Sequence, residues 1–154
     1  MIQVTVTTEV DVAADTAFTY LADVTRNHEW QDGVESTEWT SSPPGEIGST
    51  YKQTMEYRNQ VARYRVTALE PGRSITVESV GKATIPPVVT RSVEERSTDG
   101  CFVHVTIVGH LRGLRRMTRG ALEKMIRKTT EIDYTVLKRL LESAGSHDDP
   151  ETEA

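Results

Sequence analysis

The first dozen residues of the chain alternate between apolar and polar side chains. The apolar positions are Ile2, Val4, Val6, Val10 and Val12, and the residues between them are mostly polar. A period of two is typical of a strand with one buried face and one solvent-facing side. The sequence therefore predicts a strand at the start of the chain.

Helical spacing replaces this alternation after Asp15, a residue type that favours the N-cap position of a helix. The apolar positions with helical spacing are Phe18, Leu21 and Ala22. We expect a helix over about residues 15–23, followed by a short second helical turn that ends at Trp30.

From residue 34 to residue 111 the chain has the pattern of strands separated by turns. The expected strands are residues 34–40, 50–58, 61–69, 74–80, 88–97 and 101–108. Short polar or glycine-containing turns separate several of them, including Asn59-Gln60, Glu70-Pro71-Gly72 and Thr98-Asp99-Gly100. Hairpin spacing of this kind predicts an antiparallel meander of about seven strands in all, the first strand included.

One long helix is expected over about residues 114–143. Its apolar stripe contains Leu114, Met117, Ala121, Leu122, Met125, Ile132, Val136 and Leu140. A helix of roughly 28 residues is about 42 Å long, and its stripe needs a large apolar partner. The sheet is that partner, so the predicted fold is α+β: an antiparallel sheet curled around a C-terminal helix, with two short helices after the first strand.

Four segments in this order resemble known sequence features of the START-like (SRPBCC) superfamily, which has the helix-grip fold. They are residues 13–24, 26–30, 45–51 and 64–75, and the resemblance covers about residues 2–142. The chain is most similar to the polyketide cyclase/dehydratase and lipid-transport proteins of that superfamily. The resemblance implies a cavity between the sheet and the long helix that holds a hydrophobic or amphipathic small molecule. It implies no catalytic residue, because the superfamily has no universal catalytic motif.

The 154 residues suit one domain, which we place at residues 1–142. The net charge of −5 is unevenly distributed: residues 1–111 carry −6, residues 112–142 carry +5, and residues 143–154 hold four acids and no base. This last segment has no apolar pattern, and we expect an acidic, disordered tail.

Composition excludes several classes of protein. The single cysteine, Cys101, excludes a disulfide framework, and the negative charge argues against general nucleic-acid binding. We find no apolar run long enough to span a membrane and no leader peptide, so we expect a cytoplasmic location. The four histidines lack metal-ligand spacing, and there is no glycine-rich phosphate loop. We therefore expect neither a metal nor a cofactor. The sequence does not indicate an oligomeric state.

The apolar face of a single-layer sheet should be its concave face, and the long helix adds its own stripe. The residues we expect to bind the ligand are Trp30, Tyr51, Gln53, Met55, Tyr57, Tyr64, Val66, Val77, Arg91, Val93, Val103, Val105, Thr118, Met125, Thr129 and Asp133. Tyrosines bury a ring while offering one hydroxyl, which suits oriented binding. A role as core and rim aromatics explains them equally well.

Asp133, Arg91 and Tyr57 are the candidates for catalysis. Asp133 lies inside the stripe, where a carboxylate must be paired, hydrogen-bonded or protonated; an acid that reaches water at the stripe margin is the alternative. Arg91 and Glu95 share one strand face, which is either inward or solvated; the other register places Thr90, Ser92 and Glu94 inside.

Other reactive side chains have structural explanations. We expect His104 and His110 to face solvent, Cys101 to be a buried thiol, and His28 to be a surface residue near the cavity mouth, where it would also suit a general base. The cluster Arg112, Arg115, Arg116 and Arg119 opposes the dipole of the last helix and is either a solvated face or a surface for an anionic partner.

Three functions compete on these observations. The first is binding or carriage of a small hydrophobic or amphipathic molecule, lipid-like or polyketide-like, in the cavity. The second is a polyketide cyclase/dehydratase-type enzyme acting in the same cavity. The third is a protein- or membrane-interaction module that uses the arginine cluster at residues 112–119. The first is favoured because the sequence indicates an apolar cavity more clearly than an acid/base pair.

Overall fold

The computed structural model describes residues 1–57, 60–81, 87–110 and 118–147, with the side chains of 145–147 excepted. The elements in chain order are β1 (Ile2–Val10), α1 (Ala14–Ala22), η1 (Val24–Glu29), β2 (Val34–Trp39), β3 (Thr50–Met55), β4 (Val61–Glu70), β5 (Ser74–Val80), β6 (Val88–Ser97), β7 (Gly100–Gly109) and α2 (Arg119–His147). This order confirms the predicted α+β fold with its two short helices after the first strand.

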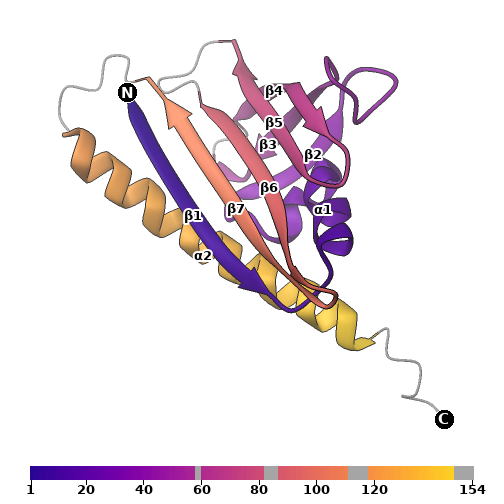
Figure 1. Cartoon of the computed structure of the whole chain (residues 1–154). Helices are drawn as coiled ribbons and strands as arrows, with labels where there is room; N and C mark the ends of the chain where they lie inside the picture. Colours follow the sequence, from indigo (N-terminus) through magenta and orange to yellow (C-terminus); the bar gives the residue numbers. More distant parts are fainter. Residues whose placement is uncertain (58–59, 82–86, 111–117, 148–154) are drawn as a thin grey trace.

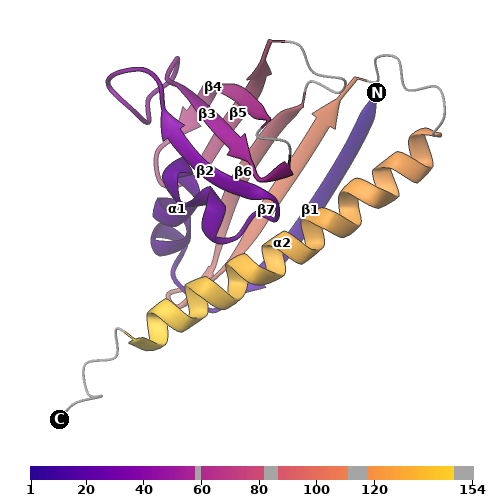
Figure 2. The same ribbon diagram turned by 180° about the vertical axis from the view of Figure 1, so that it is seen from behind.

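The strands form one seven-stranded sheet with the order β1-β7-β6-β5-β4-β3-β2. Every neighbouring pair is antiparallel, and all but the β1–β7 pair are consecutive in sequence. The sheet curls, and α2 runs along one face of it beside β1, as the two opposite views in Figures 1 and 2 show. The helix-grip arrangement is therefore present.

Alternation places one side of each strand in a shared core between the sheet and the helices. In β1, for example, Val4 lies opposite Ile107 of β7, and Val6 lies opposite Val105. The turn between β4 and β5 uses Pro71 and then Gly72, whose φ of +77° is the left-handed conformation that a type II turn requires at that position.

The first helix begins one residue earlier than the sequence suggests. Its N-cap residue is Ala13, which gives no side-chain hydrogen bond, so the predicted capping by Asp15 is wrong. Asp15 instead lies in the first turn, where its charge favours the positive end of the helix dipole. The side-chain cap belongs to the next element, because Asp23 accepts a hydrogen bond from the backbone N–H of Thr25 at the start of η1.

The side that the long helix presents to the core overlaps only in part with the predicted stripe: of the stripe residues, Leu122 is buried, and Val136 and Leu140 are half-buried against the core. Leu122, Tyr134, Leu137 and Leu141 are its buried large apolar residues, and Ile126 is half-buried. Met125 and Ile132 belonged to the predicted stripe but are 51% and 55% exposed. Residues 114–117 of the prediction lie outside the described residues, and the helix continues to His147, beyond the expected end at Ser143.

Polar side chains of α2 cover the backbone of the edge strand β1. Glu123 accepts from Gln3 N at 2.9 Å, and Glu142 accepts from Asp11 N, just beyond the strand, at 2.9 Å. Arg127 donates to Thr5 O at 2.7 Å, and Lys138 donates to Glu9 O at 2.8 Å. The helix therefore satisfies edge backbone groups that a strand would otherwise pair.

Among the described helices, none combines the length and the apolar character needed to cross a membrane. Cys101 is fully buried, as expected for a structural thiol. The domain limit at residue 142 and the tail remain predictions, and residues 148–154 lie outside the described part of the chain.

Candidate functional site

An internal cavity of about 150 Å³ lies between the concave face of the sheet and α2. Its walls come from the segment after η1, from β3 to β7, and from the middle of α2. The lining residues are Trp30, Gln31, Tyr51, Gln53, Tyr64, Val77, Val89, Arg91, Val105, Ile107, Thr130, Asp133 and Tyr134. The cavity thus combines aliphatic and aromatic walls with a small set of polar groups, as ligand sites do.

Arg91 is the cation of this cavity. It lies in β6 between Ile75 of β5 and Val105 of β7, both buried, so it shares their inward face. Its side chain is only 8% exposed. The guanidinium Nε donates a hydrogen bond to Tyr134 Oη at 3.2 Å, and the guanidinium carbon lies 5.4 Å from the centroid of the Trp30 ring. An aromatic face at that distance stabilises a cation.

Aromatic rings form two contacts around this cation. Trp30 meets Tyr134 edge-to-face with ring centroids 5.0 Å apart, and Tyr51 stacks on Tyr64 at 5.2 Å. Burial raises the pKa of the Tyr51, Tyr64 and Tyr134 hydroxyls, and the nearby Arg91 guanidinium only partly offsets this effect. All three hydroxyls are therefore protonated at neutral pH and remain able to donate.

A buried amide group forms the β3 side of the cavity. Gln53 Oε1 accepts from Asn27 Nδ2 at 3.1 Å and from Thr37 Oγ1 at 3.2 Å. These bonds join β3 to η1 and β2, and they fix the orientation of the Gln53 amide. The Gln53 Nε2 group donates to Met55 Sδ at 4.0 Å, so both ends of this amide are held by neighbouring side chains.

Asp133 lies at the margin of the cavity and is half-buried. Its Oδ1 accepts from Asp32 N at 3.1 Å. Burial is the main cause that raises the pKa of this carboxyl; the Asp32 charge adds to it, while the hydrogen bond from Asp32 N and the Arg91 charge oppose it. Within the described residues, Asp133 and Arg91 form no ion pair with each other, so the two charges share the cavity without neutralising each other directly.

Some buried polar atoms have no hydrogen-bond partner in the described part of the protein. Two belong to cavity residues, Trp30 Nε1 and Gln31 Nε2. The third is Asn27 Oδ1, behind the cavity wall. Unsatisfied buried polar atoms are rare in native proteins, so each of these atoms is a candidate for a functional contact.

The structure brings together half of the residues predicted to bind a ligand. Those that line the cavity are Trp30, Tyr51, Gln53, Tyr64, Val77, Arg91, Val105 and Asp133. Val66, Val93 and Val103 are buried in the core but do not line the cavity, and half-buried Met55 does not line it either.

Four predicted site residues are exposed, which corrects the expectation that they face inward. Tyr57 is 66% exposed because β3 ends at Met55 and the chain turns before reaching it. Met125 and Thr129 are exposed because the buried side of α2 is turned away from them. Thr118 is exposed just before the helix, where its Oγ1 accepts a hydrogen bond from Ala121 N. Tyr57 was also a candidate for catalysis, and its position gives it no access to the cavity.

The sequence left open which face of β6 points inward, and the structure shows that Arg91 faces inward. Glu95 is exposed and does not join Arg91 in the cavity. His104 lies on the other face of the sheet and bonds to Thr7 and Glu94. His28 and His110 are exposed. Of the arginine cluster at 112–119, only Arg119 lies within the described residues, and it is exposed.

Five lining residues were not among the predicted ligand-binding residues: Gln31, Val89, Ile107, Thr130 and Tyr134. Thr130 and Tyr134 lie one turn apart and share the buried side of α2 with Leu137. That spacing could have predicted the buried side of the helix. However, Met125 and Ile132 form an equally regular apolar row, shifted by one residue along the chain. Gln31 follows Trp30 directly and has no pattern of its own.

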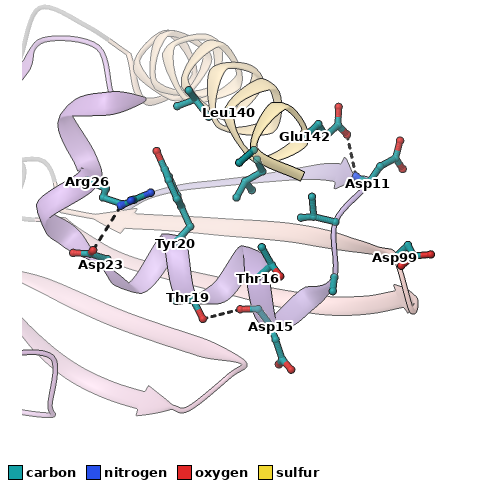
Figure 3. Close-up of a pocket in the computed structure, with 14 residues that line it drawn as sticks. Asp11, Asp15, Thr16, Thr19, Tyr20, Asp23, Arg26, Asp99, Leu140 and Glu142 are labelled. Carbon is teal, nitrogen blue, oxygen red and sulfur yellow. Dashed lines mark hydrogen bonds and ion pairs between the residues drawn. The ribbon is translucent and has the colours of Figure 1, made fainter. Parts of the chain in front are cut away.

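A larger hollow of about 1200 Å³ lies on the surface between α1 and the C-terminal part of α2. Figure 3 shows Thr19 and Tyr20 of α1 on one side and Leu140 and Glu142 of α2 on the other. Its rim is acidic, with Asp11, Asp15, Asp23, Asp99 and Glu142 against Arg26. Asp23 pairs with Arg26, Asp11 with Arg96, and Glu142 with Lys138. Its charged, open lining suits an apolar ligand less well than the internal cavity does.

The fold is that of a START-like helix-grip protein, and its cavity lies between the sheet and the long helix. The sequence of residues 1–142 matches the family described as polyketide cyclase / dehydrase and lipid transport. The chain belongs to this family. A comparison with curated proteins found no significant match.

Solved structures with the same fold include several of different function. A START superfamily protein from Mycobacterium smegmatis has a TM-score of 0.78 at 15% identity, covering 92% of this chain and 98% of that one. The di-domain ARO/CYC protein BexL of the BE-7585A biosynthetic pathway has a TM-score of 0.76 at 14% identity, covering 92% and 47%. A norcoclaurine synthase mutant from Thalictrum flavum, in complex with a transition state analogue, has a TM-score of 0.65 at 14% identity, covering 93% and 95%. At sequence identities this low, the structural similarity establishes the fold alone.

Proposed function

We propose that this protein binds or carries one small amphipathic molecule in the cavity between the sheet and α2. The observation that carries the proposal is the position of Arg91: a buried cation on the inward face of the sheet, surrounded by aromatic rings and aliphatic side chains. Burying a charge is costly unless something compensates for it. A ligand that presents polar atoms to Arg91 and apolar surface to the walls supplies that compensation.

The cavity volume limits what can enter. About 150 Å³ is the size at which an apolar protein cavity holds a molecule of the size of benzene. The ligand, or the part of it that enters, is therefore equivalent to one ring or a short acyl chain. Tyr51 and Tyr64 stack as one flat wall, and Val77 and Val105 provide aliphatic surface on neighbouring strands.

The experiment is recovery of bound small molecules by denaturing mass spectrometry, together with thermal shifts across a panel of one-ring and short-chain amphiphiles. Val105→Phe fills the cavity, and Val61→Phe is the matched control because Val61 is exposed. The proposal requires that recovery and thermal shifts are lost in Val105→Phe and kept in Val61→Phe. Equal behaviour of the two variants would place any binding elsewhere and refute the proposal.

A cyclase/dehydratase-type enzyme is the second candidate, and one observation favours it. Asp133 lines the same cavity as protonated tyrosine hydroxyls, and burial raises its pKa toward the range useful for proton transfer. However, its only hydrogen bond among the described residues comes from the backbone of Asp32, not from a second titratable side chain. Binding therefore remains the first proposal. Asp133→Asn separates the two, since an enzyme loses turnover while a carrier keeps its ligand affinity.

A further inference from the structure

We propose that the ligand of the internal cavity carries a single carboxylate, which binds the Arg91 guanidinium and the unpartnered N–H groups of Trp30 and Gln31. This inference rests on the proposed binding function and adds the chemical class of the ligand. Its basis is an excess of hydrogen-bond donors on the cavity wall.

Arg91 contributes the largest part of this excess. A guanidinium has several N–H donors and no acceptor, so it needs acceptors on its planar fork. Among the described residues, Arg91 uses Nε for Tyr134, its guanidinium also donates toward the Tyr51 hydroxyl, and it has no ion pair with any carboxylate. Two neutral hydroxyls do not use up the five N–H donors of a guanidinium, so the remaining donors of this buried cation are left for groups inside the cavity. A carboxylate matches the geometry of the fork with two parallel bonds.

Trp30 and Gln31 extend the donor set from the segment after η1. Trp30 is 3% exposed, its Nε1 has no partner within the described residues, and an indole N–H can only donate. Gln31 Nε2 is likewise buried without a partner. Both residues line the cavity together with Arg91, which also lies over the Trp30 ring. Unpartnered donors on residues that line one cavity select an acceptor group.

The charges in the cavity favour a monoanion over a dianion. Arg91 is the one cation among the lining residues, and Asp133 is the one acid. A single ligand carboxylate balances the charge of Arg91 and leaves Asp133 as the only further charge, whereas a phosphate dianion would bring the cavity to three negative charges against one positive charge. The volume of about 150 Å³ accommodates one ring or a short chain with that carboxylate.

The test compares carboxylates with neutral molecules of nearly the same shape. Benzoate is paired with benzamide, and hexanoate with hexanol, and their affinities are measured by calorimetry on the full chain. We expect each carboxylate to bind at least about tenfold more tightly than its neutral partner. Arg91→Met should remove this preference, and Arg91→Lys should weaken it because an ammonium lacks the planar fork.

Trp30→Phe provides a second, independent variant, since it keeps an aromatic ring and removes only the indole N–H. We expect it to weaken benzoate binding several-fold, with folding checked by circular dichroism. Equal affinity for benzoate and benzamide, or benzoate affinity unchanged in Arg91→Met, overturns the carboxylate inference and leaves the proposed function standing. Failure of all four probes to bind, with no small molecule recovered from the purified protein, overturns both.

Discussion

Arg91 Nε donates to Tyr134 Oη at 3.2 Å, and this bond joins strand β6 of the sheet to the long helix α2 at the cavity. Arg91 comes from β6 and Tyr134 from α2, so the two residues are brought together only by the folded arrangement. The bond fixes the position of the guanidinium among the rings that surround it. It therefore both supports the fold and orients the main polar group of the site.

Tyr134→Phe tests the structural part of this relationship. The substitution keeps the ring that contacts Trp30 and removes the acceptor of a buried, charge-assisted hydrogen bond. Such bonds contribute about 1.5–3 kcal/mol, so we expect a loss of that size in the free energy of unfolding. Urea denaturation measures it. A loss well below about 1 kcal/mol would show that Arg91 finds another acceptor and that the bond is not structural.

Arg91→Met should behave differently, because the cost of burying a cation disappears together with its favourable contacts. Desolvation of a buried ion costs several kcal/mol, while the cation–π contact and the hydrogen bond each return up to about 2–3 kcal/mol. We expect the free energy of unfolding to stay within about 1 kcal/mol of the parent protein. Arg91→Ala, which also leaves a void, is the comparison and should be clearly less stable. A Met variant as unstable as the Ala variant would contradict this account.

The orientation of α2 is tested by two aliphatic residues on its opposite sides. Leu137 is 1% exposed and Ile132 is 55% exposed. Truncation of a buried leucine costs about 2–5 kcal/mol, so Leu137→Ala should destabilise strongly. Ile132→Ala should cost less than about 1 kcal/mol, as surface substitutions generally do. Reversal of this order in urea denaturation would restore the helix orientation that the sequence alone suggested.

Asp133 makes stability depend on pH in a defined direction. Because its pKa is raised in the folded state, the folded chain binds this proton more tightly than the unfolded chain does. The resulting stabilisation is fully present below the ordinary carboxyl value of 3.8 and is lost as the pH rises through the raised value. At neutral pH the charged carboxylate is therefore a net cost, and Asp133→Asn should be more stable than the parent protein.

The advantage of Asp133→Asn should shrink on acidification from about pH 7 to about pH 4, where the parent carboxyl takes up its proton. Urea denaturation at both pH values measures the difference. Asp99→Asn, in the exposed turn between β6 and β7, is the control for a general effect of removing one negative charge. An advantage that is constant with pH, or shared by the control, would contradict the assignment.

Most of the fold was predictable because its signals are local. The alternation of apolar and polar residues in β1 and the turn at Pro71-Gly72 can each be predicted from the sequence of that segment alone. The inward face of β6 was not predictable in this way, because Arg91 and Glu95 interrupt the row that contains Val89 and Val93, and the other row is mostly polar. The neighbours decide it: Arg91 lies between Ile75 and Val105, and a residue shares a face with its cross-strand partners.

The candidate site was predictable on the sheet and not on the helix. Tyr51, Gln53 and Tyr64 lie where strand alternation placed them. The helix carries two apolar rows about 100° apart, one through Met125 and one through Ile126, and its own sequence does not choose between them. The packing of α2 against β1 determines which row is buried. It brings Thr130 and Tyr134 to the cavity, and neither residue was predicted there.

The contacts of α2 with the backbone of β1 have a consequence for association between chains. A sheet can grow only where an edge strand offers free N–H and C=O groups to another strand. Along β1, the side chains of Glu123, Arg127 and Lys138 already occupy such groups. A second polypeptide that adds a strand to this sheet must therefore pair with β2, the opposite edge strand. Strand addition is thus restricted to one edge, because the protein's own helix covers the other.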